Sequence, residues 1–138
     1  MSDNCNDKQK KIVIKELRLE ENAFIIHSTT KSITLLRKLE KKCQEKEGIF
    51  HLAFEGKHSY VGVDWPEEGF VSDPDPGMTP YVINFRIGEL PNHVCFSFRK
   101  QHVCVRIYWL DAWHHLEQKF KATWLTSTLI ITPEDKVA

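Results

Sequence analysis

The sequence predicts a single α+β domain, in which a mainly antiparallel sheet of about six to eight strands carries two amphipathic helices packed on it. Its length of 138 residues suits one domain of ordinary size. Short segments rich in β-branched and aromatic residues are separated by turn residues, which is typical of strands joined in hairpins. Two other segments repeat their apolar residues at steps of three and four, which indicates helices.

The two ends of the chain are polar, and the sequence between them is rich in apolar residues. We expect residues 1–10 to be a disordered tail, residues 11–133 to form the domain, and residues 134–138 to be a second tail. No apolar run approaches the roughly 20 residues that a membrane span needs, so we expect no membrane association. The N-terminus lacks the apolar core of a secretory signal, which favours a cytoplasmic protein with reduced cysteines.

The first elements are a hairpin and a helix. Residues 11–19 and 23–28 read as two strands. Thr29 or Thr30 can then cap a helix, and Gly48 is well placed to end it. The helix is predicted from apolar residues that share one face: Ile33, Leu36, Leu39 and Cys43.

The middle of the chain predicts three more strands, at residues 49–54, 59–65 and 81–87. Residues 66–80 differ from these segments because they contain four prolines and two glycines. No regular element is expected at that density, so the sequence predicts a long loop. Loops of this length are uncommon inside compact domains and often carry function.

The next two strands can be placed in register. A turn centred on Lys100 and Gln101 directs every apolar residue of both strands toward one core. The predicted cross-strand pairs are Val94 with Ile107, Phe96 with Val105, and Phe98 with Val103. The opposite face then carries His93, Cys95, Ser97, Arg99, His102, Cys104, Arg106 and Tyr108.

A second helix and a final strand complete the expected order. Asp111 can cap the helix, and its apolar stripe falls at steps of three, four and four: Trp113, Leu116, Phe120 and Trp124. Together with Trp109, this stripe is more typical of a packed core than of a ligand cavity. Residues 125–132 form the last strand, and this β-rich segment also allows a homodimer through edge pairing.

The first candidate site is an acidic stretch that carries aromatic rings. Carboxylates attract a basic partner at long range, and an aromatic anchor is buried on contact. The candidate partner-binding residues are Asp64, Trp65, Glu67, Glu68, Phe70, Asp73 and Asp75. The alternative is an ordinary solvated loop whose rings fold back onto the core.

The second candidate site is a basic strand face. Its residues could hold a phosphate or carboxylate, or stack on a base: Arg99, His102, Arg106 and Tyr108. The alternative is that this face is solvated, or that it pairs with the acidic stretch of the same chain. The formal net charge is zero, with 19 basic and 19 acidic residues, which argues against a general nucleic-acid binder.

Catalysis and metal binding have weaker support. His102 could act with His27, His51 or His58 as an acid–base pair on RNA, but the sequence does not fix their separation. Cys95, Cys104, His93 and His102 are possible zinc ligands whose spacing matches no zinc motif. We therefore expect no metal or cofactor, and we do not favour an enzyme.

These observations favour a small cytoplasmic protein that binds a basic partner protein and thereby occludes it. The most concrete form is an immunity protein that neutralises a toxin, such as a nuclease with a positively charged active site. The alternative is an RNA- or nucleotide-binding module, or a small RNA-processing enzyme, that uses the basic strand face.

Overall fold

The computed structural model describes residues 12–55, 58–72, 82–85, 93–100, 102–109 and 112–134. Within these ranges it contains one helix, α2 (Thr30–Lys46), and ten strands that form one sheet. The strands are β1 (Ile14–Glu20), β2 (Ala23–Ser28), β3 (Ile49–Glu55), β4 (His58–Trp65), β5 (Gly69–Ser72), β6 (Val82–Phe85), β7 (His93–Phe98), β8 (Val103–Trp109), β9 (Ala112–Trp124) and β10 (Thr128–Pro133).

The strand order across the sheet is β5-β4-β3-β7-β8-β9-β10-β2-β1-β6. Neighbouring strands run antiparallel throughout, except for β1 and β6, which are parallel. The antiparallel pairing that the hairpins predict is therefore confirmed.

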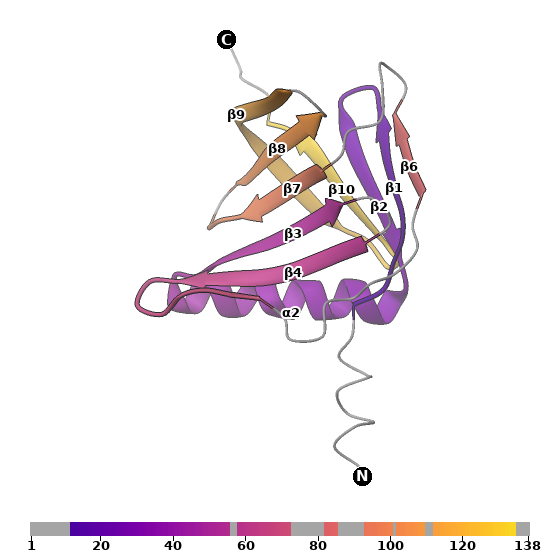
Figure 1. Cartoon of the computed structure of the whole chain (residues 1–138). Coiled ribbons are helices and arrows are strands. Elements are labelled where there is room, and N and C mark those ends of the chain that lie inside the picture. The colour runs from indigo at the N-terminus through magenta and orange to yellow at the C-terminus, as the bar shows by residue number, and fades with distance from the viewer. Residues whose placement is uncertain are drawn as a thin grey trace.

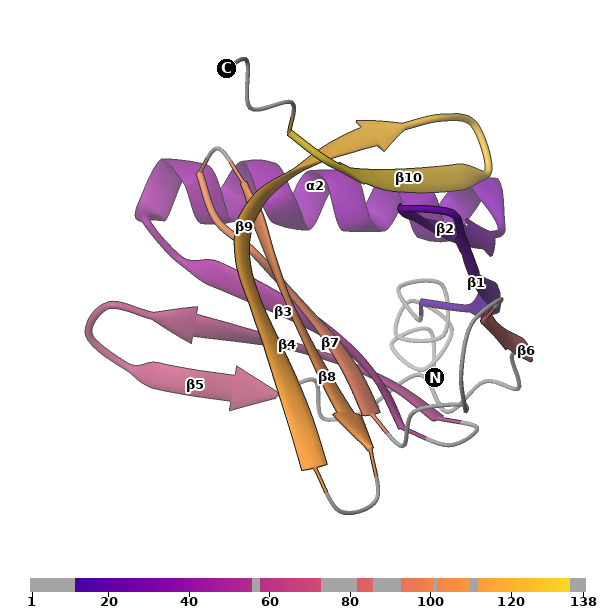
Figure 2. The same cartoon turned by 90° about the horizontal axis from the view of Figure 1, so that it is seen from above.

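The sheet curls so strongly that its two halves face each other across one core (Figures 1 and 2). The bend lies in β9, whose first part pairs with β8 and whose last part pairs with β10. Phe24 of β2 and Phe96 of β7 show the result, because their ring centroids are 5.2 Å apart. Three strands separate β2 from β7 in the sheet order, so only curvature brings these rings together. Helix α2 contacts both β3 and β10, one strand from each half.

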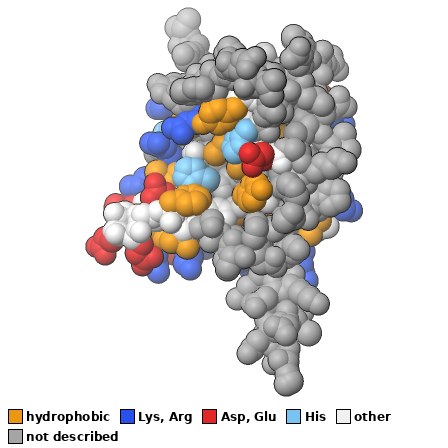
Figure 3. Space-filling view, viewed as in Figure 1, with side chains coloured by type: hydrophobic (Ala, Val, Ile, Leu, Met, Phe, Trp, Pro, Cys, Tyr) orange, Lys and Arg blue, Asp and Glu red, His pale blue; other side chains and the backbone are white. Residues whose placement is uncertain are grey.

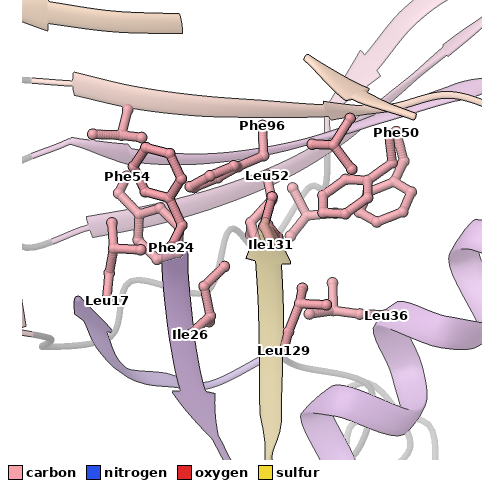
Figure 4. Packing of buried hydrophobic residues seen from close by; sticks show 14 of the residues in the cluster. Leu17, Phe24, Ile26, Leu36, Phe50, Leu52, Phe54, Phe96, Leu129 and Ile131 are labelled. Carbon is pink, nitrogen blue, oxygen red and sulfur yellow. The ribbon is translucent and has the colours of Figure 1, made fainter. Parts of the chain in front are cut away.

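The core is made of side chains from alternate strand positions, as expected when one face of a sheet is buried (Figure 4). Phenylalanines dominate it. Phe50 stacks on Phe98 with ring centroids 4.3 Å apart, and Phe24 also contacts Phe120 edge to face. Such pairs contribute about 0.5–1.5 kcal/mol beyond the area that they bury.

Helix α2 confirms the prediction of a helix in this region. Thr29 caps it, with its hydroxyl accepting a hydrogen bond of 3.0 Å from the Ser32 N–H. Its apolar face packs into the core through Ile33, Leu36 and Cys43. The C-terminus differs from the expectation, because the left-handed residue is Glu47, with φ of 61°, and not Gly48.

Gly48 is required for a different reason. A β-carbon at this position would lie 2.6 Å from Cζ3 of Trp65, which is closer than real β-carbons come to other atoms. The Trp65 ring therefore packs directly on the backbone where α2 turns into β3.

The prediction of two helices on six to eight strands is wrong. The expected second helix, capped by Asp111, is instead the strand β9. Pairing with β8 and β10 on its two sides satisfies its backbone, and this outweighs the helical spacing of its apolar residues. Its last part alternates as a strand, with Phe120 buried and Lys119 and Lys121 exposed.

Besides β9, one more strand was not predicted from the sequence, and it lies in the segment that was expected to be a loop. Residues 69–72 form β5, which pairs with β4 at one end of the sheet. Gly69 has φ of +82°, a conformation that favours glycine, and it starts the strand after a tight turn. Residues 73–80 of that segment lie outside the described residues, as do the predicted tails apart from Glu134.

The predicted register of the β7–β8 hairpin is confirmed. The structure pairs Val94 with Ile107, Phe96 with Val105, and Phe98 with Val103. The expected edge pairing through residues 125–132 is not possible in this fold, because β10 is already bonded to β9 and β2 on its two sides.

We predict that Phe96→Ala lowers the free energy of unfolding by about 3–5 kcal/mol, because it leaves a cavity where the two halves of the sheet meet. The matched control is Phe70→Ala, since Phe70 lies on β5 with 60% of its surface exposed. This control is expected to change the free energy by less than about 0.5 kcal/mol. Urea denaturation measures both values, and equal losses would contradict the proposed core.

Candidate functional site

The side of the curved sheet that points away from the core is here called the outer face. Histidine side chains lie there among apolar side chains, with Lys and Arg to one side and Asp and Glu mostly toward the β4–β5 turn (Figure 3). Strand alternation places its residues, because cross-strand partners share a face. They include His51, Tyr60, Gly62, Asp64, Phe70, His93, Cys95, Ser97, Cys104, Arg106 and Tyr108.

Phe70 is the most exposed large apolar residue on the described surface, at 60%. Its ring lies directly over Gly62 of the neighbouring strand, in space that any larger side chain would fill. The ring also contacts His51 of β3, with centroids 5.7 Å apart and planes inclined by 60°. Phe70 is thus held in place from below while its outer surface stays open to a partner.

His51 and Ser97 form a cross-strand pair between β3 and β7. Nδ1 of His51 and Oγ of Ser97 are 2.8 Å apart and share a hydrogen bond. Burial lowers the pKa of His51 below its ordinary value of 6.5; Asp64 opposes this shift, and Arg106 and Arg99 add to it. His51 is therefore neutral near pH 7 and acts as a fixed polar support beside Phe70.

The other half of the outer face is also arranged for packing. His93 contacts Tyr108 edge to face with ring centroids 5.1 Å apart, and burial lowers the pKa of His93. Burial raises the pKa of the Cys95 thiol, so it stays protonated and is a poor nucleophile.

Among the described residues, no three His, Cys, Asp or Glu side chains come close enough to hold a metal ion, and this includes the zinc set considered from the sequence.

The structure separates the predicted acidic residues. Asp64 is exposed and lies opposite Phe70 in the β4–β5 pair, and Glu67 and Glu68 are exposed at the turn that joins these strands. We call Phe70 with these three carboxylates the acidic surface. Trp65 instead packs partly against the core, so for this ring the alternative expectation holds. Asp73 and Asp75 lie outside the described residues.

The predicted basic residues do not form one cluster. Arg99 and His102 lie at the β7–β8 turn and line a groove of about 510 Å³. Arg106 and Tyr108 lie further along β8, paired with Cys95 and His93. The strand rise of about 3.3 Å per residue puts the α-carbons of His102 and Arg106 roughly 13 Å apart. A single ligand as small as one phosphate therefore cannot contact the whole predicted set.

The ion pairs within the described residues join Arg18 to Glu20 and His27 to Glu16. No carboxylate of the acidic surface takes part in one there. Pairing of the acidic and basic residues within the chain, which was the alternative expectation, is thus not found in the described part of the structure.

Sequence reasoning missed two features of this region. From the sequence, His51 was considered only as one of three possible acid–base partners of His102. Its contact with Ser97 was not predicted, because the β3–β7 pairing links residues 46 positions apart. Lys119 was assigned to a helix and not to the groove that it shares with Arg99. A correct strand assignment for residues 112–124 would have placed it beside β8.

We predict that acidification below pH 6.5 destabilises the protein in part through His51. Because its pKa is lower in the folded state, the unfolded state binds more protons in this range, and stability falls as the pH falls. His51→Gln should reduce the loss of urea midpoint between pH 7.5 and 5.5. A His51 imidazole that titrates at or above 6.5 in an NMR pH series would contradict this prediction.

No helix in the described residues is both long and apolar enough to cross a membrane. The chain matches no protein-family model, and no curated protein or solved structure shows significant similarity to it.

Proposed function

We propose that the protein binds a basic protein partner through the acidic surface. The observation that supports this most directly is the 60% exposure of Phe70 beside Asp64, Glu67 and Glu68. A large exposed apolar ring with carboxylates nearby matches the usual arrangement of an interface anchor beside a polar rim.

Phe70 has the features of an anchor that is ready to bind. It lies over Gly62 and against His51, so its position is fixed before any partner arrives. Fixing a side chain during association otherwise costs about 0.5–1.5 kcal/mol.

The carboxylates supply selectivity for charge. Asp64, Glu67 and Glu68 are exposed, and within the described residues none of them forms an ion pair, although Glu67 and Glu68 line a groove together with Lys42 and Lys46. Such groups speed encounter with a cationic protein and disfavour acidic ones. Contact with Phe70 would then hold the partner in place.

The concrete form of this proposal is a cytoplasmic inhibitor that occludes the positively charged active site of a toxin, such as a nuclease. Occlusion requires only a stable surface of complementary charge, and it needs no catalytic group. This matches an outer face on which His51 and His93 are half-buried in ring contacts and the Cys95 thiol stays protonated.

We predict that Phe70→Ala weakens binding of the partner by about 30-fold or more, as the loss of an interface hot spot does. The partner is to be captured from extracts of the native host with the wild-type chain, identified and purified. Its dissociation constants for the wild type and the variant are then compared by surface plasmon resonance.

The matched control for this experiment is Lys121→Gln, an exposed charge on β9 away from the acidic surface. It should bind as the wild type does. A partner whose affinity is unchanged by Phe70→Ala would contradict the proposal. Capture of nucleic acid alone would also contradict it and would favour the RNA-binding alternative.

We also predict that reversing two charges, with Glu67→Lys and Glu68→Lys together, slows association by about 10-fold while dissociation changes less. The effect should shrink when the salt concentration rises from 0.05 to 0.5 M, because screening shortens the reach of exposed charges. A variant that alters only the dissociation rate would contradict the steering role of these carboxylates.

A further inference from the structure

A second feature lies on the same outer face, where the β7–β8 turn meets the C-terminal end of α2, and its Ile49 is the cross-strand partner of Asp64. A groove of about 510 Å³ opens here, and we call it the basic groove. Four basic side chains line it, together with one carboxylate and an apolar floor. The full lining is Glu47, Gly48, Ile49, Arg99, Lys100, His102 and Lys119.

The backbone that carries these side chains is firmly held. The N–H of Arg99 donates to the carbonyl of His102 over 2.9 Å, which closes the turn. The side-chain amide of Gln44 on α2 donates to the carbonyl of Lys100 over 3.4 Å and ties the turn to the helix. The cations therefore project from a fixed base into a shared space.

The core beneath the groove adds to this rigidity. Phe98 and Val103, the residues that flank the turn, are 2% and 3% exposed. Phe120, which follows Lys119 in β9, pairs with Val103 and is 2% exposed. Lys119 thus reaches the groove from a different strand, and its base is also anchored in the core.

The charges in the groove are unbalanced. Arg99, Lys100 and Lys119 are cations, and Glu47 is the one carboxylate in the lining. Within the described residues, none of these three cations forms an ion pair. Three like charges that share one concave space create a positive field that a bound anion would neutralise.

We propose that the basic groove binds a phosphate monoester. The planar guanidinium of Arg99 suits two parallel hydrogen bonds to phosphate oxygens, and the two lysines supply point charges. An imidazole N–H of His102 can donate a further hydrogen bond. Ile49 provides an apolar surface for the organic part, and the volume lies within the usual range of small-ligand sites, about 300–1,000 Å³.

This proposal does not depend on the proposed function. The basic groove and the acidic surface are neighbours, because Ile49 pairs with Asp64, but they share no residue. A phosphate monoester could come from a small metabolite or from the 5′ end of a nucleic acid. Both sources present the same dianion, so the experiment has one arm for each of them.

Isothermal titration with ribose 5-phosphate tests the first source, with ribose as the uncharged comparison. A single-stranded RNA hexamer, with and without a 5′-phosphate, tests the second. We expect at least one phosphorylated probe to bind at least 10-fold more tightly than its unphosphorylated counterpart.

The variants Arg99→Gln and Lys119→Gln should each weaken that binding by about 10-fold or more, as the loss of a charged hydrogen bond does. Lys121→Gln is the matched control, because Lys121 is an exposed lysine on the same strand that does not line the groove. It should change the affinity less than 2-fold. The uncharged change Phe70→Ala should leave phosphate binding unchanged, which separates this proposal from the proposed function.

Three results would overturn the proposal. One is the absence of binding by every phosphorylated probe at 5 mM. Another is equal binding of the hexamer with and without its 5′-phosphate, which would point to the RNA backbone instead. The third is equal weakening by Lys119→Gln and Lys121→Gln, which would show attraction to general surface charge. Unchanged thermal midpoints of the variants establish that any loss arises in a folded protein.

Discussion

Strand β9 is hydrogen-bonded to β8 along its first part and to β10 along its last part, and this double pairing determines the shape of the molecule. A flat sheet of ten strands would leave a wide apolar face in water. Bending at β9 instead brings the two halves together, so that Phe24 and Phe96 meet edge to face. The dense phenylalanine core, and the position of α2 against both halves, depend on this bend.

The same bend has an effect on the other side of the sheet. Because the buried apolar residues of β3, β7 and β8 point inward, the outer face carries mostly small, polar and aromatic side chains, with Ile49 as an exception. Gly62 leaves room for the ring of Phe70, and the contact between His51 and Ser97 supports it from the next strands. The acidic surface and the basic groove lie next to each other on this frame, where Asp64 pairs with Ile49, and the overall charge is zero.

Local features could be predicted from the sequence, and distant pairings could not. The register of β7 and β8 followed from alternation across a short turn, and α2 followed from its cap and its apolar stripe. The β3–β7 pairing joins segments far apart in the chain, so the contact of His51 with Ser97 carried no local signal. Residues 112–124 were misassigned because their aromatic spacing fits a helix as well as it fits a bent strand, and only the neighbouring strands decide between them. For the candidate site, exposure distinguished Phe70 from Trp65, and composition cannot supply that information.

The pairing of β2 with β10 has a consequence for biosynthesis. His27 and Thr128 share a hydrogen bond across 101 positions of the chain. The ribosome therefore completes the β1–β2 hairpin long before the strand that covers its inner edge has been translated. Until the segment through Pro133 emerges from the exit tunnel, that hairpin has an open edge and an uncovered apolar face, which is the state in which chaperones protect nascent chains from aggregation.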